Sequence, residues 1–167
     1  MYHTIEEFIN DWKNEAGLTQ KVLDTLTDES LNQQVTTEDR TLGRIAWHIV
    51  TSLDEMITRT GLTFEAAKHD TPVPSLAKVI ADSYRTSSEN MLAAIKEHWT
   101  DASLNEMDDM YGEQWPKGLT LSVIISHQTH HRGQMTVLMR QAGLKVPGVY
   151  GPAREEWSAF GMEAPQI

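Results

Sequence analysis

Apolar residues recur at three- and four-residue intervals in four long stretches of the chain, residues 5–26, 42–57, 76–99 and 120–138. This spacing places them on one face of an α-helix, so each stretch predicts an amphipathic helix. No convincing alternation of apolar and polar residues, the pattern typical of a half-buried strand, accompanies them. The sequence therefore predicts an all-α fold, a four-helix bundle.

Local signals mark where these helices begin. Thr4 and Glu7 have the spacing of a capping box at the start of the first helix. Thr41 precedes the second helix, and Ser75 is expected to cap the third. Thr120 is expected to open the fourth.

Two further segments lie outside the four helices. Residues 100–118 form a long acidic connection before the last core helix, interrupted by glycine and proline but rich in apolar and aromatic residues. A connection of this length is either a packed surface loop that covers the core or a lid over a site. Residues 151–157 predict the start of a short C-terminal helix. We expect residues 1–167 to form a single domain, since this length suits one hydrophobic core.

The composition narrows the classes of function. The chain has 24 acidic and 14 basic residues, a net charge of -10 and no cluster of lysine and arginine, so nucleic acid is not an expected partner. It has no cysteine, which excludes disulfides and thiolate ligands and suits a cytoplasmic location. No apolar run approaches ~18 residues, so no membrane span is expected, and the first residues do not resemble a secretion signal.

Three histidines are the candidates for chemistry. His127 and His131 are four residues apart and lie on one helical face, and His48 sits in the apolar second helix. Leaving such imidazoles buried without partners would cost about 1–3 kcal/mol each, whereas one metal ion would satisfy all three. The alternative is that they are hydrogen-bonded histidines at the edge of the core. His130 points roughly 100° away from His131 and is expected outside the ligand set, although it is the leading substitute.

The residues around the pair limit the type of site. Gln128 stands where a zinc metalloprotease motif carries its glutamate, and neither His127 nor His131 has the preceding glutamate of a di-iron bundle. A mononuclear site with three neutral imidazoles would leave a coordination position open for water or substrate. Imidazole ligands suit several divalent metals, of which zinc and nickel are the leading candidates.

Two segments carry a resemblance to a known family. Residues 127–135 (HQTHHRGQM), followed by the residues 141–143 (QAG), resemble the last core helix of the DinB family, and residues 41–48 (TLGRIAWH) resemble its second helix. The resemblance implies a four-helix bundle with a non-simple connection order, commonly a homodimer. It also implies a divalent metal held by His48, His127 and His131. The family name does not imply DNA binding.

The resemblance also suggests a reaction. Related enzymes in this superfamily are bacterial transferases and isomerases that use low-molecular-weight thiols. It thus implies a metal-dependent enzyme acting on a small molecule, such as an S-transferase that joins a thiol co-substrate to an electrophile, with no side chain assigned as catalytic acid or base. A metal-dependent hydrolase and a non-catalytic metal- or ligand-binding dimeric bundle remain the alternatives.

Overall fold

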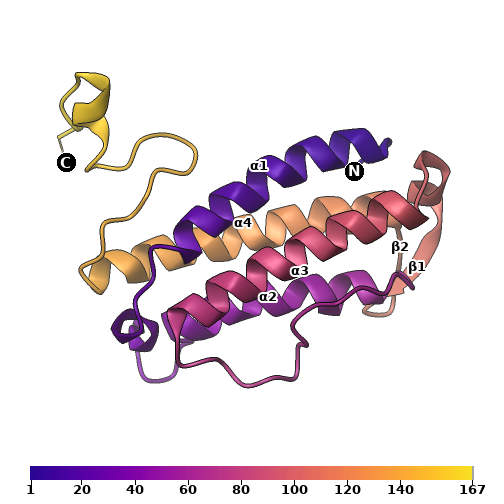
Figure 1. Cartoon of the computed structure of the whole chain (residues 1–167), viewed down its shortest axis with the longest axis horizontal. Coiled ribbons are helices and arrows are strands. Elements are labelled where there is room, and N and C mark those ends of the chain that lie inside the picture. The colour runs from indigo at the N-terminus through magenta and orange to yellow at the C-terminus, as the bar shows by residue number, and fades with distance from the viewer. Residues whose placement is uncertain (167) are drawn as a thin grey trace.

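The computed structural model describes residues 1–166 and confirms the predicted all-α four-helix bundle (Figure 1). The long helices are α1 (Ile5–Leu23), α2 (Leu42–Thr58), α3 (Ala77–His98) and α4 (Lys117–Gln141). Short 3-10 helices η1 (Glu29–Asn32), η2 (Asp101–Asn105) and η3 (Trp157–Phe160) and the strands β1 (Met107–Met110) and β2 (Glu113–Pro116) lie in the connections and the C-terminal segment.

The helices do not neighbour one another in chain order. Both α1 and α2 pack chiefly against α3 and α4, so the consecutive helices α1 and α2 lie on opposite corners of the bundle, as do α3 and α4. This is the non-simple connection order that the family resemblance implied. It makes α2 and α4 direct neighbours, and these two helices carry the candidate histidines.

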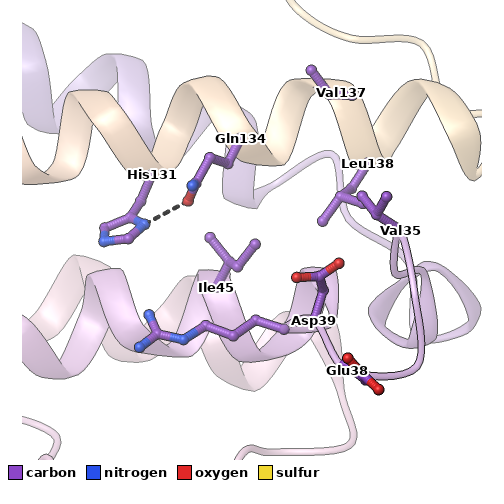
Figure 2. A pocket seen from close by; sticks show the side chains of 9 residues that line it. Val35, Glu38, Asp39, Ile45, His131, Gln134, Val137 and Leu138 are labelled. Carbon is purple, nitrogen blue, oxygen red and sulfur yellow. Dashed lines mark hydrogen bonds between the residues drawn. The ribbon is translucent and has the colours of Figure 1, made fainter.

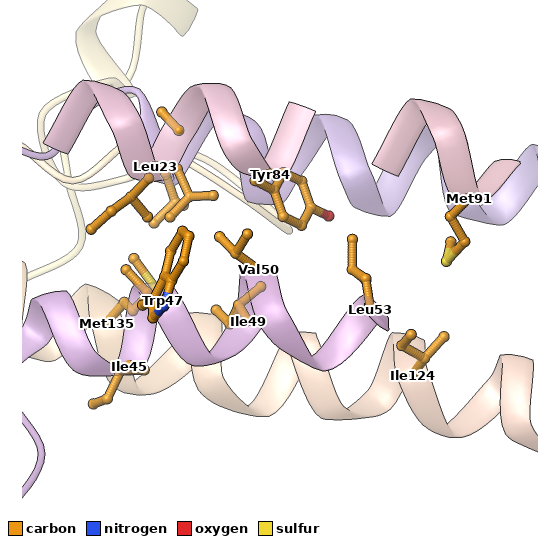
Figure 3. Close-up of a cluster of buried hydrophobic side chains, with 14 of the residues drawn as sticks. Leu23, Ile45, Trp47, Ile49, Val50, Leu53, Tyr84, Met91, Ile124 and Met135 are labelled. Atoms are coloured by element: carbon orange, nitrogen blue, oxygen red, sulfur yellow. The ribbon is translucent and has the colours of Figure 1, made fainter. Parts of the chain in front are cut away.

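Large apolar side chains from all four helices fill the centre of the bundle (Figure 3). Fully enclosed examples are Phe8, Trp12, Ile49, Leu53, Ile80, Met91, Ile124 and Met135. Burial of each such side chain contributes roughly 1.5–3 kcal/mol. The polar end of Trp12 is also satisfied, because its indole N–H donates to Ser88 Oγ at 3.0 Å.

The capping predictions are correct for the first two helices. Thr4 Oγ1 accepts from the Glu7 N–H at 3.2 Å, while Glu7 Oε2 accepts from the Thr4 N–H at 3.3 Å, which completes the capping box. Thr41 Oγ1 accepts from the N–H of Arg44 at 3.1 Å at the start of α2. These local bonds satisfy helix N–H groups that have no partner within the helix.

The two other predicted starts are wrong. Leu76, not Ser75, is the N-cap of α3, because Asp28 from the α1–α2 connection accepts from the Ala77 N–H at 2.7 Å in place of a local cap. Helix α4 begins at Lys117, before the predicted Thr120. Gly118 therefore lies in the first turn of α4, although glycine usually weakens a helix. Packing requires a glycine here, because a Cβ at this position would collide with the Tyr2 carbonyl.

Residues 100–118 contain a β-hairpin that the sequence analysis did not predict. Strands β1 and β2 pair antiparallel, and the turn residues Tyr111 and Gly112 both have positive φ, 61° and 87°. The acidic, four-residue strands show too little alternation to be recognised from the sequence. Leu104 and Met110 are buried, so the segment packs over the core as a surface element. The expected C-terminal helix is a single 3-10 turn, η3.

A buried ion pair connects α1 to α4. Arg132 Nη2 lies 2.7 Å from Glu15 Oε2, and Arg132 Nη1 donates to Thr19 Oγ1 at 2.9 Å. The hydroxyl of Tyr150, from the C-terminal segment, donates to the same Glu15 oxygen at 2.6 Å. Both charged side chains are buried, so each provides the opposite charge that the other needs inside the protein.

None of the helices formed by residues 1–166 combines the length and the apolarity that a membrane crossing needs.

Removing one member of the buried pair should be strongly destabilising. We expect Arg132→Met to lower the free energy of unfolding by about 3–5 kcal/mol, because Glu15 is left buried without its cation. The double variant E15L/R132M should be more stable than R132M alone, as measured by urea denaturation. The exposed Arg154→Ala provides the control. Equal stability of R132M and wild type would contradict the structural role of the pair.

Candidate metal centre

Three histidine side chains from two neighbouring helices converge at one point. His48 extends from α2, and His127 and His131 extend from successive turns of α4. The distances between ring centroids are 4.9 Å for His48–His127, 4.7 Å for His48–His131 and 4.5 Å for His127–His131. One ring nitrogen from each histidine lies within 4.8 Å of the other two. The structure thus brings together the three residues that the sequence singled out, and they could hold a metal ion.

Two of the donor atoms are spaced as metal ligands require. His48 Nε2 and His127 Nε2 are 3.1 Å apart. Two nitrogens bound to one tetrahedral zinc ion at ~2.0–2.1 Å lie roughly 3.3 Å from each other, which is close to this separation. The third donor, from His131, lies within 4.8 Å of both, so these three side chains could hold an ion.

The surroundings keep the three imidazoles neutral. Burial, together with a smaller effect of the neighbouring histidines, lowers the pKa of His48 and of His127 to about 4. Burial also lowers the pKa of His131. An imidazole must be deprotonated to bind a metal, so the lone pairs of this cluster are available at neutral pH.

The rings of His48 and His127 are joined through their Nε2 atoms, a contact that leaves the donor undefined, whereas the ring of His131 has a partner that fixes its tautomer. His131 Nδ1–H donates to Gln134 Oε1 at 2.7 Å, which leaves His131 Nε2 free to bind an ion (Figure 2). His127 Nδ1 is buried and has no hydrogen-bond partner in the described part of the chain. Gln134 was not assigned a role from the sequence, although its position three residues after His131 on the same helix is a usable signal.

The remaining histidines stay outside the cluster. The ring of His130 lies 4.9 Å from that of His131, but it does not share the point at which the other three meet, as expected. His69 approaches Asp54, with 3.8 Å between Nδ1 and Oδ2, and His98 lies beside Glu97 at the exposed end of α3.

Gln128, which occupies the position of a metalloprotease glutamate, faces away from the cluster. Its Oε1 accepts from Thr19 Oγ1 at 3.2 Å and from the Tyr84 hydroxyl at 2.7 Å, and the side chain is completely buried. Its role is therefore to join α1, α3 and α4 in the core. This geometry agrees with the prediction that the metalloprotease mechanism does not apply here.

A cavity of about 560 Å³ opens beside His131 (Figure 2). Side chains from α2, α4 and the connection between α1 and α2 line it: Val35, Glu38, Asp39, Arg40, Ile45, His131, Gln134, Val137 and Leu138. Its volume is in the range typical of small-molecule sites. The sequence analysis missed Arg40 because residues of an irregular connection follow no periodic pattern.

Two charged groups act on the histidines from opposite sides. The positive charge of Arg40 contributes to lowering the pKa of all three imidazoles. The carboxylate of Glu55, two turns beyond His48 on α2, acts in the opposite direction on His127. Glu55 is itself held by the Tyr111 hydroxyl at 2.6 Å and by Arg59 Nε at 2.9 Å, so the hairpin tip is connected to this side of the site.

Comparison with known proteins identifies relatives of this chain. The sequence profile of the DinB family matches residues 1–166. YrdA of Bacillus subtilis (strain 168), described as an uncharacterized protein, is 53% identical over 167 residues, which is the full length of both chains. Neither finding names a substrate or a metal.

Two solved structures are similar to this one. A DinB-like protein from Bacillus cereus ATCC 10987 is 52% identical, with a TM-score of 0.87, over 90% of this chain and 100% of that one. A second DinB-like protein, YjoA of Bacillus subtilis, has a TM-score of 0.66 at 15% identity, over 86% of this chain and 97% of that one, and it shows the shared fold alone. The match over nearly the whole chain and the two close relatives lead to one conclusion: this chain belongs to the DinB family.

Proposed function

We propose that this protein is a metal-dependent enzyme that acts on a small molecule, with His48, His127 and His131 as the ligands of one divalent ion. The observation that carries the proposal is the convergence of three neutral imidazoles next to a small-molecule-sized cavity. Zinc and nickel are the ions we favour, since both accept imidazole nitrogen.

The chemistry follows from the ligand set. Three neutral ligands leave the full charge of a divalent ion in place, and such an ion ionises a coordinated thiol or water. Gln134 would hold His131 in the tautomer that presents Nε2 to the ion. Because burial lowers the pKa of His48 and His127, protons would not compete with the ion for these nitrogens at neutral pH.

Among the reactions open to such a site, we favour transfer of a low-molecular-weight thiol to an electrophile. The chain has no cysteine, so a thiolate must come from the co-substrate. The cavity beside His131 would receive the bound molecule. In keeping with the family, we propose a homodimer in the cytoplasm.

Substitution of the paired histidines should strongly weaken metal binding. We expect one zinc or nickel ion per wild-type chain by elemental analysis, and a loss of at least about tenfold in affinity for H127A/H131A, because a single imidazole remains. The matched control is His130→Ala, next to His131 but outside the cluster. Unchanged metal content in H127A/H131A would refute the ligand assignment.

The metal-free protein should become less stable as the pH falls through the window from 6.5 to about 4. The pKa of His127 is about 4 in the folded chain and near 6.5 when unfolded, so in this window the unfolded chain binds more protons and unfolding is favoured. Relative to wild type, His127→Gln should therefore gain stability between pH 7 and pH 4.5, measured by urea denaturation in the presence of a chelator. His98→Gln, at the protein surface, corrects for general effects of losing an imidazole. A wild-type-to-variant difference that does not change with pH would contradict the desolvated site.

Turnover should require an added thiol. We expect the metal-loaded protein to consume an aromatic halide electrophile only when a small thiol is present, and His48→Ala to lose this activity with its metal. The measurement is the absorbance of the thioether product across a panel of thiols. Ester cleavage that proceeds without thiol would instead identify a hydrolase, and inactivity across both panels would favour a non-catalytic binding bundle.

A further inference from the structure

The cavity beside His131 is lined by one cation, the guanidinium of Arg40, and by the carboxylates of Glu38 and Asp39. Arg40 lines this cavity and is exposed, and its side chain forms no ion pair or hydrogen bond within residues 1–166. It follows Glu38 and Asp39 in the sequence but pairs with neither. Its charge acts on all three imidazoles, so the guanidinium belongs to the electrostatic environment of the histidine cluster.

The neighbouring carboxylates limit the charge of an anion that could bind there. Asp39 is engaged locally, since its Oδ2 accepts from Thr36 Oγ1 at 2.8 Å. Glu38 also lines the cavity. A doubly charged phosphate would be repelled by both acidic groups, whereas a single carboxylate can pair with the Arg40 fork at a smaller electrostatic cost.

Four aliphatic side chains also line the cavity, and two of them are open to solvent. Val35 and Val137 are 64% and 58% exposed, although both are aliphatic. Together with Ile45 and Leu138 they form a continuous apolar lining between the connection before α2 and the end of α4 (Figure 2). A ligand with an aliphatic or aromatic body would remove this surface from water.

We propose that this cavity binds a small amphiphilic carboxylate, with Arg40 as the residue that selects the carboxylate. The acid group pairs with the guanidinium, and the apolar body lies against Val35, Val137 and Leu138. His131 lines the same cavity, so a thiol at the other end of a flexible molecule can reach the histidine cluster. That second contact rests on the proposed function, whereas recognition of the carboxylate depends only on the cavity.

The first experiment uses the metal-free protein and therefore does not depend on the metal. Hexanoate, 1-hexanol and hexylamine are titrated into protein labelled at its methyl groups, and NMR shifts of the Val137 and Leu138 methyls report binding. We expect hexanoate to bind more tightly than 1-hexanol, and R40Q to weaken hexanoate binding about tenfold with little effect on 1-hexanol. Arg44→Gln is the matched control. Arg44 is an exposed arginine in the first turn of α2, close to Arg40 in the sequence, but it does not line the cavity.

Two results would overturn the proposal. One is equal binding of hexanoate to wild type and R40Q, which would remove Arg40 from recognition. The other is a preference for hexylamine that disappears in E38Q, which would identify a cation site. Under our proposal E38Q leaves hexanoate binding unchanged or strengthens it, because a repelling carboxylate is removed.

The second experiment connects the cavity to the ion. In protein loaded with cobalt(II), absorption bands of a cobalt–thiolate bond report binding of 6-mercaptohexanoate and 6-mercapto-1-hexanol. We expect tighter binding of the acid, and loss of that preference in R40Q. If cobalt is not bound, the proposed metal function fails while the hexanoate result still stands. If both thiols bind cobalt equally well in wild type and in R40Q, the metal function stands and the carboxylate proposal fails.

Discussion

The buried ion pair between Glu15 and Arg132 determines how α4 is oriented in this bundle. Successive residues of an α-helix point roughly 100° apart, so a helix that directs Arg132 toward α1 must direct His131 elsewhere. The pair, together with Thr19 and Tyr150, fixes the first direction. His131, and with it His127 one turn earlier, is then presented to α2 and to His48. The geometry of the histidine cluster therefore depends on a charge interaction on another face of the same helix.

The two sides of the cluster are built differently. Toward the end of α4, Gln134 fixes the ring of His131, and the cavity provides an apolar wall and the guanidinium of Arg40. Toward the hairpin, Glu55 contributes the opposite charge and is held by Tyr111. A molecule that approaches the cluster from the cavity thus meets the guanidinium of Arg40 together with the carboxylates of Glu38 and Asp39, whereas the carboxylate of Glu55 lies on the hairpin side.

Helical periodicity was sufficient to predict the four helices, because each apolar stripe is long. The position of His127 and His131 on one face of their helix could also be predicted, since they are four residues apart. Several failures were non-local. Asp28 from another connection, not Ser75, accepts from the first N–H of α3, and packing against the Tyr2 carbonyl requires glycine at position 118 in the first turn of α4. Arg40 was missed because its connection has no periodic pattern and only the folded chain places that connection beside α4.

The separation of the histidines along the chain has a consequence for folding kinetics. His127 and His131 share a helix, but His48 is 79 residues away from His127, so the third donor is available only after a long loop has closed. An ion held by all three would cross-link α2 to α4 and would bind the unfolded polypeptide much less well. Such a cross-link would act mainly on the rate of unfolding, since α2 and α4 could not separate without first releasing the ion.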